Sequence, residues 1–303
     1  MQTQAIDFHP PAEEAAPILL PVTASLFADR ADRFAHLADN HSLGEWLHFL
    51  GQISRTQHEI IKGLPTLPLP DAAALEQART HGMPPLNASA LRHPVAWRYV
   101  LQQLALRLEN EAPEAARAVL KDLTAASDEE LERLADMLLK GEPDMACAAQ
   151  LPFVAAALQV VFTQLASQLD ASHLQKLDSH GVCPCCGSLP VASVVRLGAA
   201  INNLRYLHCS LCNTEWNVPR ATCTTCDTDK EVALHEIEGS KGAVRAETCD
   251  ACKSYLKIVY QEKDPKVDPV ADDLATLPLD MLVDEAGYER SGPNLLLIGA
   301  HSG

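Results

Sequence analysis

The stretch Cys183-Pro184-Cys185-Cys186-Gly187 opens the region that decides the fold of this 303-residue chain. Nine of the ten cysteines lie between positions 183 and 252, and eight of those nine form four pairs with the spacing C-x-x-C. The pairs are Cys183/Cys186, Cys209/Cys212, Cys223/Cys226 and Cys249/Cys252. Cysteines gathered this closely indicate a local site rather than disulfides spread through a scaffold.

The four pairs form an internal duplication. Adding 40 to the number of each cysteine in the first two pairs gives a cysteine of the last two pairs, and the same shift takes Arg205 to Arg245. Within each half, 22 residues separate the two pairs. That length is enough for a β-hairpin to bring two tight turns together. The repeat therefore predicts one supersecondary unit that is used twice.

Tetrahedral metal binding explains the spacing. Two cysteines in one tight turn can both face one ion, and two such turns supply the four thiolates of a closed site. The repeat predicts two sequential sites, with these ligands: Cys183, Cys186, Cys209 and Cys212 at the first ion, and Cys223, Cys226, Cys249 and Cys252 at the second. A closed site has no open position for a substrate water, which argues against a hydrolytic enzyme. Sulfur ligands accept zinc or iron, and the spacing does not separate these two metals.

Two cysteines lie outside the repeat. Cys185 sits inside the first turn, and we interpret it as an ordinary exposed residue between ligands, with a reactive thiol as the alternative. Cys147 is predicted to be a buried, inert thiol. Disulfide exchange of the thioredoxin type expects a single C-x-x-C pair opening a helix, and four pairs flanked by strand-like segments do not fit that pattern.

Residues 1–178 are predicted to form an all-α domain. Ser42 with Glu45, and Ser127 with Glu130, have the spacing of capping boxes that open amphipathic helices. Six scattered histidines of this half follow no metal-binding spacing, and we interpret them as surface or core residues: His36, His41, His48, His58, His81 and His93.

Two further helices of this half are predicted from their apolar residues. One begins at about Val95 and places its apolar side chains on one side. The other lies within the charge-free stretch from Met145 to Leu169. That stretch contains four glutamines and a proline, which favour a buried helix over a membrane span.

The charge balance excludes several kinds of partner. Asp and Glu number 40 against 24 Lys and Arg, a formal net charge of -16. A chain this acidic is poorly suited to nucleic-acid phosphates or to an anionic membrane surface. Residues 1–17 lack the basic start and apolar core of a secretory signal. We therefore expect a cytoplasmic protein with no nucleic-acid partner and no membrane insertion. In that compartment, paired cysteines bind metal more often than they form disulfides.

The expected fold class is α+β, with an N-terminal helical domain followed by two tandem rubredoxin-like or zinc-ribbon-like β units. The predicted boundaries are residues 1–178 for the helical domain, 179–220 and 221–265 for the two metal units, and 266–303 for an acidic C-terminal tail. The tail contains a short helix near Val270 to Thr276 and an apolar run from Leu295 to Ile298, which we expect to pack on the body.

These residues resemble the family of the formate dehydrogenase accessory protein FdhE. The resemblance depends on these motifs: Cys183-Pro184-x-Cys186-Gly187-Ser188-x-Pro190, Leu204-Arg205-Tyr206-Leu207-His208-Cys209-x-x-Cys212, Thr214-Glu215-Trp216, Cys223-x-x-Cys226, Ala246-Glu247-x-Cys249-Asp250-x-Cys252, Tyr255-Leu256-Lys257-Ile258-x-Tyr260-Gln261-Glu262-Lys263-Asp264-Pro265 and Ala271-Asp272-Asp273-Leu274-Ala275. The helical half agrees with the family in length and character, with weaker motifs.

The resemblance implies a non-catalytic cytoplasmic protein. It implies an assembly factor that binds the catalytic subunit of a respiratory formate dehydrogenase before membrane export. It also implies rubredoxin-like iron on the eight cysteines of the four pairs, so that two metal ions per chain are expected, with iron favoured over zinc. Two alternatives stay open: a rubredoxin-type electron-transfer protein, and a zinc-ribbon adaptor whose metal is purely structural.

Overall fold

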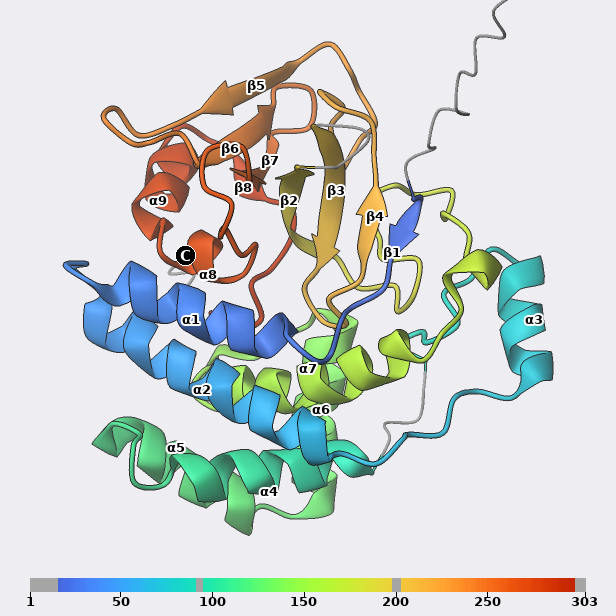
Figure 1. Cartoon of the computed structure of the whole chain (residues 1–303), viewed down its shortest axis with the longest axis vertical. Coiled ribbons are helices and arrows are strands. Elements are labelled where there is room, and N and C mark those ends of the chain that lie inside the picture. The colour runs from blue at the N-terminus through green and yellow to red at the C-terminus, as the bar shows by residue number, and fades with distance from the viewer. Residues whose placement is uncertain (1–15, 91–94, 198–202, 298–303) are drawn as a thin grey trace, which may run out of the picture.

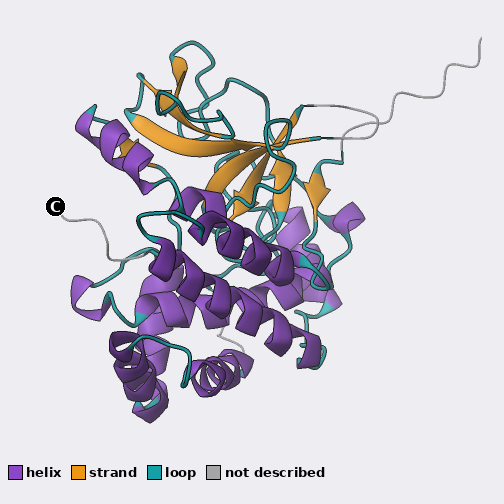
Figure 2. Cartoon of the chain, turned by 60° about the vertical axis from the view of Figure 1, so that its left-hand side comes forward, coloured by secondary structure: helices purple, strands orange, loops and turns teal. Residues whose placement is uncertain are grey.

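The computed structural model describes residues 16–90, 95–197 and 203–297. In this part of the chain a layer of helices lies against a twisted β-sheet (Figure 2). The predicted α+β class, with helices first and a sheet carrying two cysteine groups second, is confirmed. None of the helices in the described residues is long and apolar enough to cross a membrane. The predictions about residues 1–15, His93 and Ile298 lie outside the described residues.

Seven α-helices in the described residues build the helical layer. Their bounds are α1 Leu26–Ala38, α2 Gly44–Gly63, α3 Ala72–Thr80, α4 Ala96–Leu108, α5 Glu114–Ala125, α6 Asp128–Lys140 and α7 Leu151–Ser167. Single 3₁₀ turns flank α7 at Met145–Cys147 and Ala171–His173. The charge-free stretch does form a buried helix, because 14 of the 17 residues of α7 are buried. Helix α4 begins close to the predicted position and buries Trp97 and Leu104.

Of the two serines predicted to cap helices, only Ser127 does so. At the start of α6 the hydroxyl of Ser127 accepts a hydrogen bond from the Glu130 backbone N–H, and the helix ends at Gly141 in the left-handed conformation. The capping box at Ser42 is wrong, because α2 begins at Gly44 without a side-chain cap. A Cβ at Gly44 would lie 2.6 Å from the Ala38 carbonyl oxygen. The tight turn between α1 and α2 therefore sets where the helix starts.

Eight strands in the described residues pair into one sheet. Their bounds are β1 Ile18–Leu19, β2 Pro190–Arg196, β3 Leu204–Cys209, β4 Glu215–Asn217, β5 Val232–His235, β6 Val244–Cys249, β7 Ser254–Tyr260 and β8 Glu289–Arg290. The order is β1-β4-β3-β2-β7-β6-β5, and β8 pairs with β7 (Figure 1). The two repeat units therefore do not stand apart, because β2 of the first runs parallel to β7 of the second and pairs Ser193 with Ile258.

The C-terminal segment ties the two layers together. Helices α8 (Ala271–Leu274) and α9 (Leu277–Glu285) follow β7, and Leu274 is buried in the same apolar core as α7. Leu295 and Leu296 are buried there as well, as expected for the last apolar run. Figure 1 shows α8 between α1 and the sheet, while β5 lies at an edge of the sheet, on the side away from α1 and α2.

Candidate metal centres

The structure gathers the eight paired cysteines into two groups. Cys183, Cys186, Cys209 and Cys212 form the first group, and Cys223, Cys226, Cys249 and Cys252 form the second. Within each group the sulfur atoms all lie within 4.8 Å of one another. The grouping is the sequential one expected from the repeat. All the cysteines are free thiols.

The sulfur spacing fits a tetrahedral ion. A metal–sulfur bond of about 2.3 Å places the sulfurs of a regular tetrahedron about 3.8 Å apart. In the first group, Sγ of Cys183 lies 3.5 Å from that of Cys212, and the other cross-turn pair is 3.4 Å apart. The equivalent distances in the second group are 3.6 and 3.7 Å. These spacings are far longer than the roughly 2.05 Å of a disulfide. The donor set of each group thus suits zinc or iron.

The backbone of each cysteine turn explains the repeated spacing. The residue after the second cysteine of every pair has positive φ: Gly187, Asn213, Asp227 and Lys253. Gly, Asn and Asp adopt this left-handed conformation more readily than other residues. Their presence directly after three of the four pairs is therefore a sequence signal for these turns, in addition to the cysteine spacing. The turns also aim backbone N–H groups at sulfur. Leu211 and Cys212 each donate to Cys209 Sγ at 3.4 Å, an arrangement that stabilises a thiolate.

The first group is enclosed by the helical half. Its four cysteines have relative exposures of 0 to 1%. The backbone N–H of Leu86 donates to the Cys185 carbonyl at 2.8 Å, and that of Ala88 donates to the Cys186 carbonyl at 2.9 Å. Gln159 of α7 donates to the Ser210 carbonyl in the second turn at 2.8 Å. This cysteine group is therefore part of the main apolar core.

The interpretation of Cys185 as an exposed residue is wrong. It is completely buried, because the segment around Leu86 covers the turn that contains it. Sequence spacing could not reveal this contact, which joins residues about a hundred positions apart. Cys147 is buried as predicted, although its sulfur accepts a hydrogen bond from Arg133 at 3.4 Å. In the described residues neither candidate metal group contains a histidine.

The second group lies at the surface. Cys223 and Cys249 are buried, but Cys226 and Cys252 are exposed. One of its turns packs against the segment that leads to the first turn, where a Cβ at Gly181 would lie 2.4 Å from the Thr224 carbonyl oxygen. Next to it, Nδ1 of His180 lies 2.9 Å from a carboxylate oxygen of Asp227. Both side chains of that pair are largely exposed, so it contributes little to stability.

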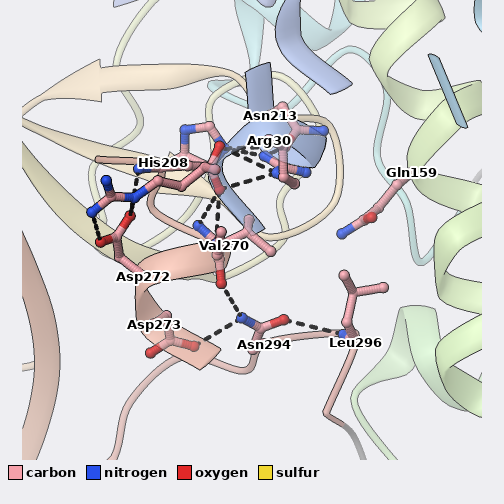
Figure 3. A network of polar contacts seen from close by, with 12 residues as sticks. Arg30, Gln159, His208, Asn213, Val270, Asp272, Asp273, Asn294 and Leu296 are labelled. Atoms are coloured by element: carbon pink, nitrogen blue, oxygen red, sulfur yellow. Dashed lines mark hydrogen bonds and ion pairs between the residues drawn. The ribbon is translucent and has the colours of Figure 1, made fainter. Parts of the chain in front are cut away.

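A buried polar network fixes the first unit to the helical layer (Figure 3). The side chain of Arg30, on α1, has no exposed surface. Its Nε donates to Asp268 at 3.1 Å and its Nη2 donates to Asn213 Oδ1 at 2.9 Å. Asn213 also donates to Thr163 of α7 at 2.8 Å. His208 lies in the same network, with Nε2 3.0 Å from Asn213 Oδ1. The cysteine spacing does not point to this network, although His208 and Asn213 directly flank cysteines of the first group.

A buried carboxylate extends this network. Glu215 lies beside Nδ1 of His208 at 2.9 Å and pairs with Arg196. Burial by itself raises the pKa of Glu215, but the hydrogen bond from His208 and the charge of Arg196 outweigh it and hold that pKa at about 2. Glu215 is therefore ionised at neutral pH. It supplies a fixed negative charge on β4, the neighbour of the strand that carries Cys209.

A second buried ion pair joins the two units. Arg205 of β3 donates to Glu247 of β6. Arg205 also donates to the Thr222 carbonyl at 3.0 Å, which holds the segment between the units. Burial raises the pKa of Glu247, and the charge of Arg205 opposes that change. Because both side chains are nearly inaccessible, loss of either would leave a buried charge without a partner.

A helical layer joined to one sheet that carries two groups of four cysteines defines a class of proteins with two sites that could each hold a metal ion. Comparison with known proteins places the chain more narrowly. Family models described as FdhE N-terminal, FdhE central domain and FdhE C-terminal domain match residues 15–179, 182–220 and 221–297. The chain belongs to the FdhE family.

Individual relatives agree with the family models. A protein FdhE homolog of Serratia proteamaculans is 40% identical over 287 residues, which cover 94% of this chain and 92% of the relative. Protein FdhE of Salmonella arizonae is 37% identical over the same coverage. The crystal structure of the FdhE protein from Pseudomonas aeruginosa matches with a TM-score of 0.86 and 38% identity, covering 94% of this chain and 99% of that one.

Proposed function

We propose that this protein is a cytoplasmic, non-catalytic accessory factor for the maturation of respiratory formate dehydrogenase. In this proposal it binds the catalytic subunit of the dehydrogenase and carries a metal ion at each group of four cysteines. The observation that supports it most directly is the match to the FdhE family along almost the whole chain. The two cysteine groups are the chemical feature that such a role would use.

We assign the ligands of the two ions to the eight paired cysteines, and we favour iron over zinc. Each group offers four sulfur donors, and in the described part of the chain no histidine or carboxylate joins them, which suits a soft or borderline metal. When bound, the metal would cross-link the two turns of each group and supply a closed centre, whose redox activity depends on the metal. With four protein ligands, such a centre has no position left for a substrate water, in agreement with a non-catalytic role.

Co-purification tests the partner. A tagged copy of this chain, expressed with the dehydrogenase catalytic subunit, should retain that subunit, and formate dehydrogenase activity should fall when the chain is deleted. Serine variants in either cysteine group should lower both the retention of the subunit and the dehydrogenase activity. If full binding and full dehydrogenase activity persisted in both sets of variants, the metal groups would have no part in the function.

Metal analysis tests the ion. Protein purified without air should contain two metal ions per chain, and ferric iron bound to thiolates should give a visible absorption that bleaches on reduction. A colourless protein with two zinc ions per chain would overturn the preference for iron and leave the assignment of the ligands intact. Protein without metal under these conditions would overturn the assignment of the ligands.

The exposure of the second group favours one other candidate function, electron transfer. Cys226 and Cys252 reach the surface, so a redox partner could approach a metal at this group closely. An electron carrier would exchange electrons with many donors and would not need a stable complex with a dehydrogenase subunit. Retention of that subunit through repeated washing of a pull-down would distinguish the assembly factor from the carrier.

A further inference from the structure

The two cysteine groups have nearly the same internal geometry and very different surroundings. Their cross-turn sulfur distances differ by no more than 0.3 Å (3.4 against 3.7 Å). All four turns use a residue with positive φ at the same position. Any difference in how the two groups hold a metal must therefore arise from what surrounds them.

Equivalent positions show the contrast directly. Cys186 is 1% exposed, whereas its counterpart Cys226, 40 residues later, is exposed. Cys212 has no exposed surface, whereas its counterpart Cys252 is exposed. The residues between the cysteines follow the same rule. The buried pair Cys185 and Leu211 corresponds to the exposed pair Thr225 and Ala251.

The location of each unit accounts for this contrast. The first unit faces α7 and the segment around Leu86, which form hydrogen bonds with both of its turns. The second unit ends the sheet at β5, a strand with three of its four residues exposed. Figure 1 shows β5 and β6 on the side of the sheet away from α2, α4 and α5. The position of each unit in the sheet thus determines how exposed its cysteines are.

Exposure controls how easily thiolate ligands are replaced. An incoming chelator must reach the ion, and each released thiolate must take a proton from water. At the first group both steps require an opening of the apolar core, which costs free energy close to that of global unfolding. At the second group Cys226 and Cys252 already meet solvent. Each of them can break its metal–sulfur bond and take a proton from water while the donors of the chelator take its place.

From this contrast we infer that the second group is an exchange site, which yields its metal to multidentate or thiol-bearing ligands at the protein surface, while the first group is a fixed structural centre. This inference depends on the proposed assignment of both groups as metal ligands. It assigns different tasks to two sites that the repeat makes look equivalent. A partner that supplies or removes metal would then act on the face formed by Cys226, Cys252 and the neighbouring turns.

A chelator challenge of the full-length protein tests the inference. Protein with two metal ions per chain is mixed with excess EDTA, aliquots are desalted, and the metal per chain is measured by mass spectrometry. Free thiols in each aliquot are labelled with iodoacetamide and mapped by peptide. One ion should leave at least about tenfold faster than the other, because local opening at a surface is much easier than opening of the core. The early label should appear on Cys223, Cys226, Cys249 and Cys252.

A substitution at Leu86, in the segment that covers the first turn, provides a second test. Leu86→Ala loosens the cover of the first turn and should accelerate the slow release while leaving the fast release unchanged. If this variant fails to fold, peptide mapping of the unmodified protein still identifies the site that opens first. Release of both ions at one rate, early labelling of the first group, or an unchanged slow rate in folded Leu86→Ala would each overturn the exchange site. A starting content of no metal would instead refute the assignment of the ligands.

Discussion

The first and second cysteine groups are two copies of one unit placed in opposite environments. The first is buried among helices, and its neighbours Asn213 and His208 belong to a polar network with α1 and α7. The second lies near an edge strand, with two of its cysteines at the surface. A duplicated cysteine motif therefore specifies the geometry of the ligands, but not how stable or accessible each site is. Stability and accessibility are set by the elements that the rest of the chain brings to each copy.

The largest expected effect comes from losing a ligand in one group or the other. Cys209→Ser should destabilise the whole protein by at least about 4 kcal/mol, because it removes a ligand inside the apolar core. The matched variant Cys249→Ser should cause a smaller loss, confined to the second unit. Thermal unfolding and amide hydrogen exchange measure both, and faster exchange should reach α7 in the first variant only. Equal losses of stability would contradict the contrast between the groups.

The next effect concerns the network that anchors the first unit. Arg30→Ala should cost about 3–5 kcal/mol, because it leaves Asp268 and buried hydrogen-bonding groups without their partner. Arg55→Ala is the matched control, since it breaks an exposed pair with Asp32 on the same helical hairpin. Urea unfolding should show little change for that control. A midpoint for Arg30→Ala equal to that of the control would mean that the network does not stabilise the fold.

A smaller effect is expected from the apolar cover. Leu86→Ala should cost about 3 kcal/mol, as do many truncations of fully buried leucines. Leu234→Ala, on β5 of the second unit, changes a side chain that is 47% exposed and should leave the melting temperature nearly unchanged. Melting curves of the two variants under identical metal loading test this pair. If Leu234→Ala lowered the melting temperature as much as Leu86→Ala, the second unit would have to be covered in solution.

The smallest effect compares the residues that follow Cys212 and Cys252. Asn213→Gly keeps the left-handed backbone accessible but removes the hydrogen bonds to Arg30 and Thr163, and it should cost about 1–3 kcal/mol. Lys253→Gly, at the equivalent position, relieves a lysine of positive φ and removes an exposed ion pair and an exposed contact with the Tyr288 ring, so little or no loss of stability is expected. Denaturant midpoints test the pair. A larger loss for Lys253→Gly than for Asn213→Gly would reverse the ranking of the two units.

Local patterns predicted the elements well where neighbours along the chain decide the outcome. The helix cap at Ser127, the helix after Val95 and the buried charge-free helix all depend on spacings within a few turns. The capping box at Ser42 failed because a contact between two helices moved the start of α2. Cys185 was assigned to the surface because nothing in its own turn reveals the segment that covers it.

The amino-acid sequence by itself determined the helical half, the duplicated unit and the composition of both cysteine groups, because these depend on short-range spacing. Only the tertiary structure decided that the two units share one sheet through β2 and β7, and that the first group is buried while two cysteines of the second group reach the surface. The physical reason is that burial depends on residues far away in the chain. Arg30 and Asp268 lie 238 positions apart, and no periodicity in the sequence records such a contact.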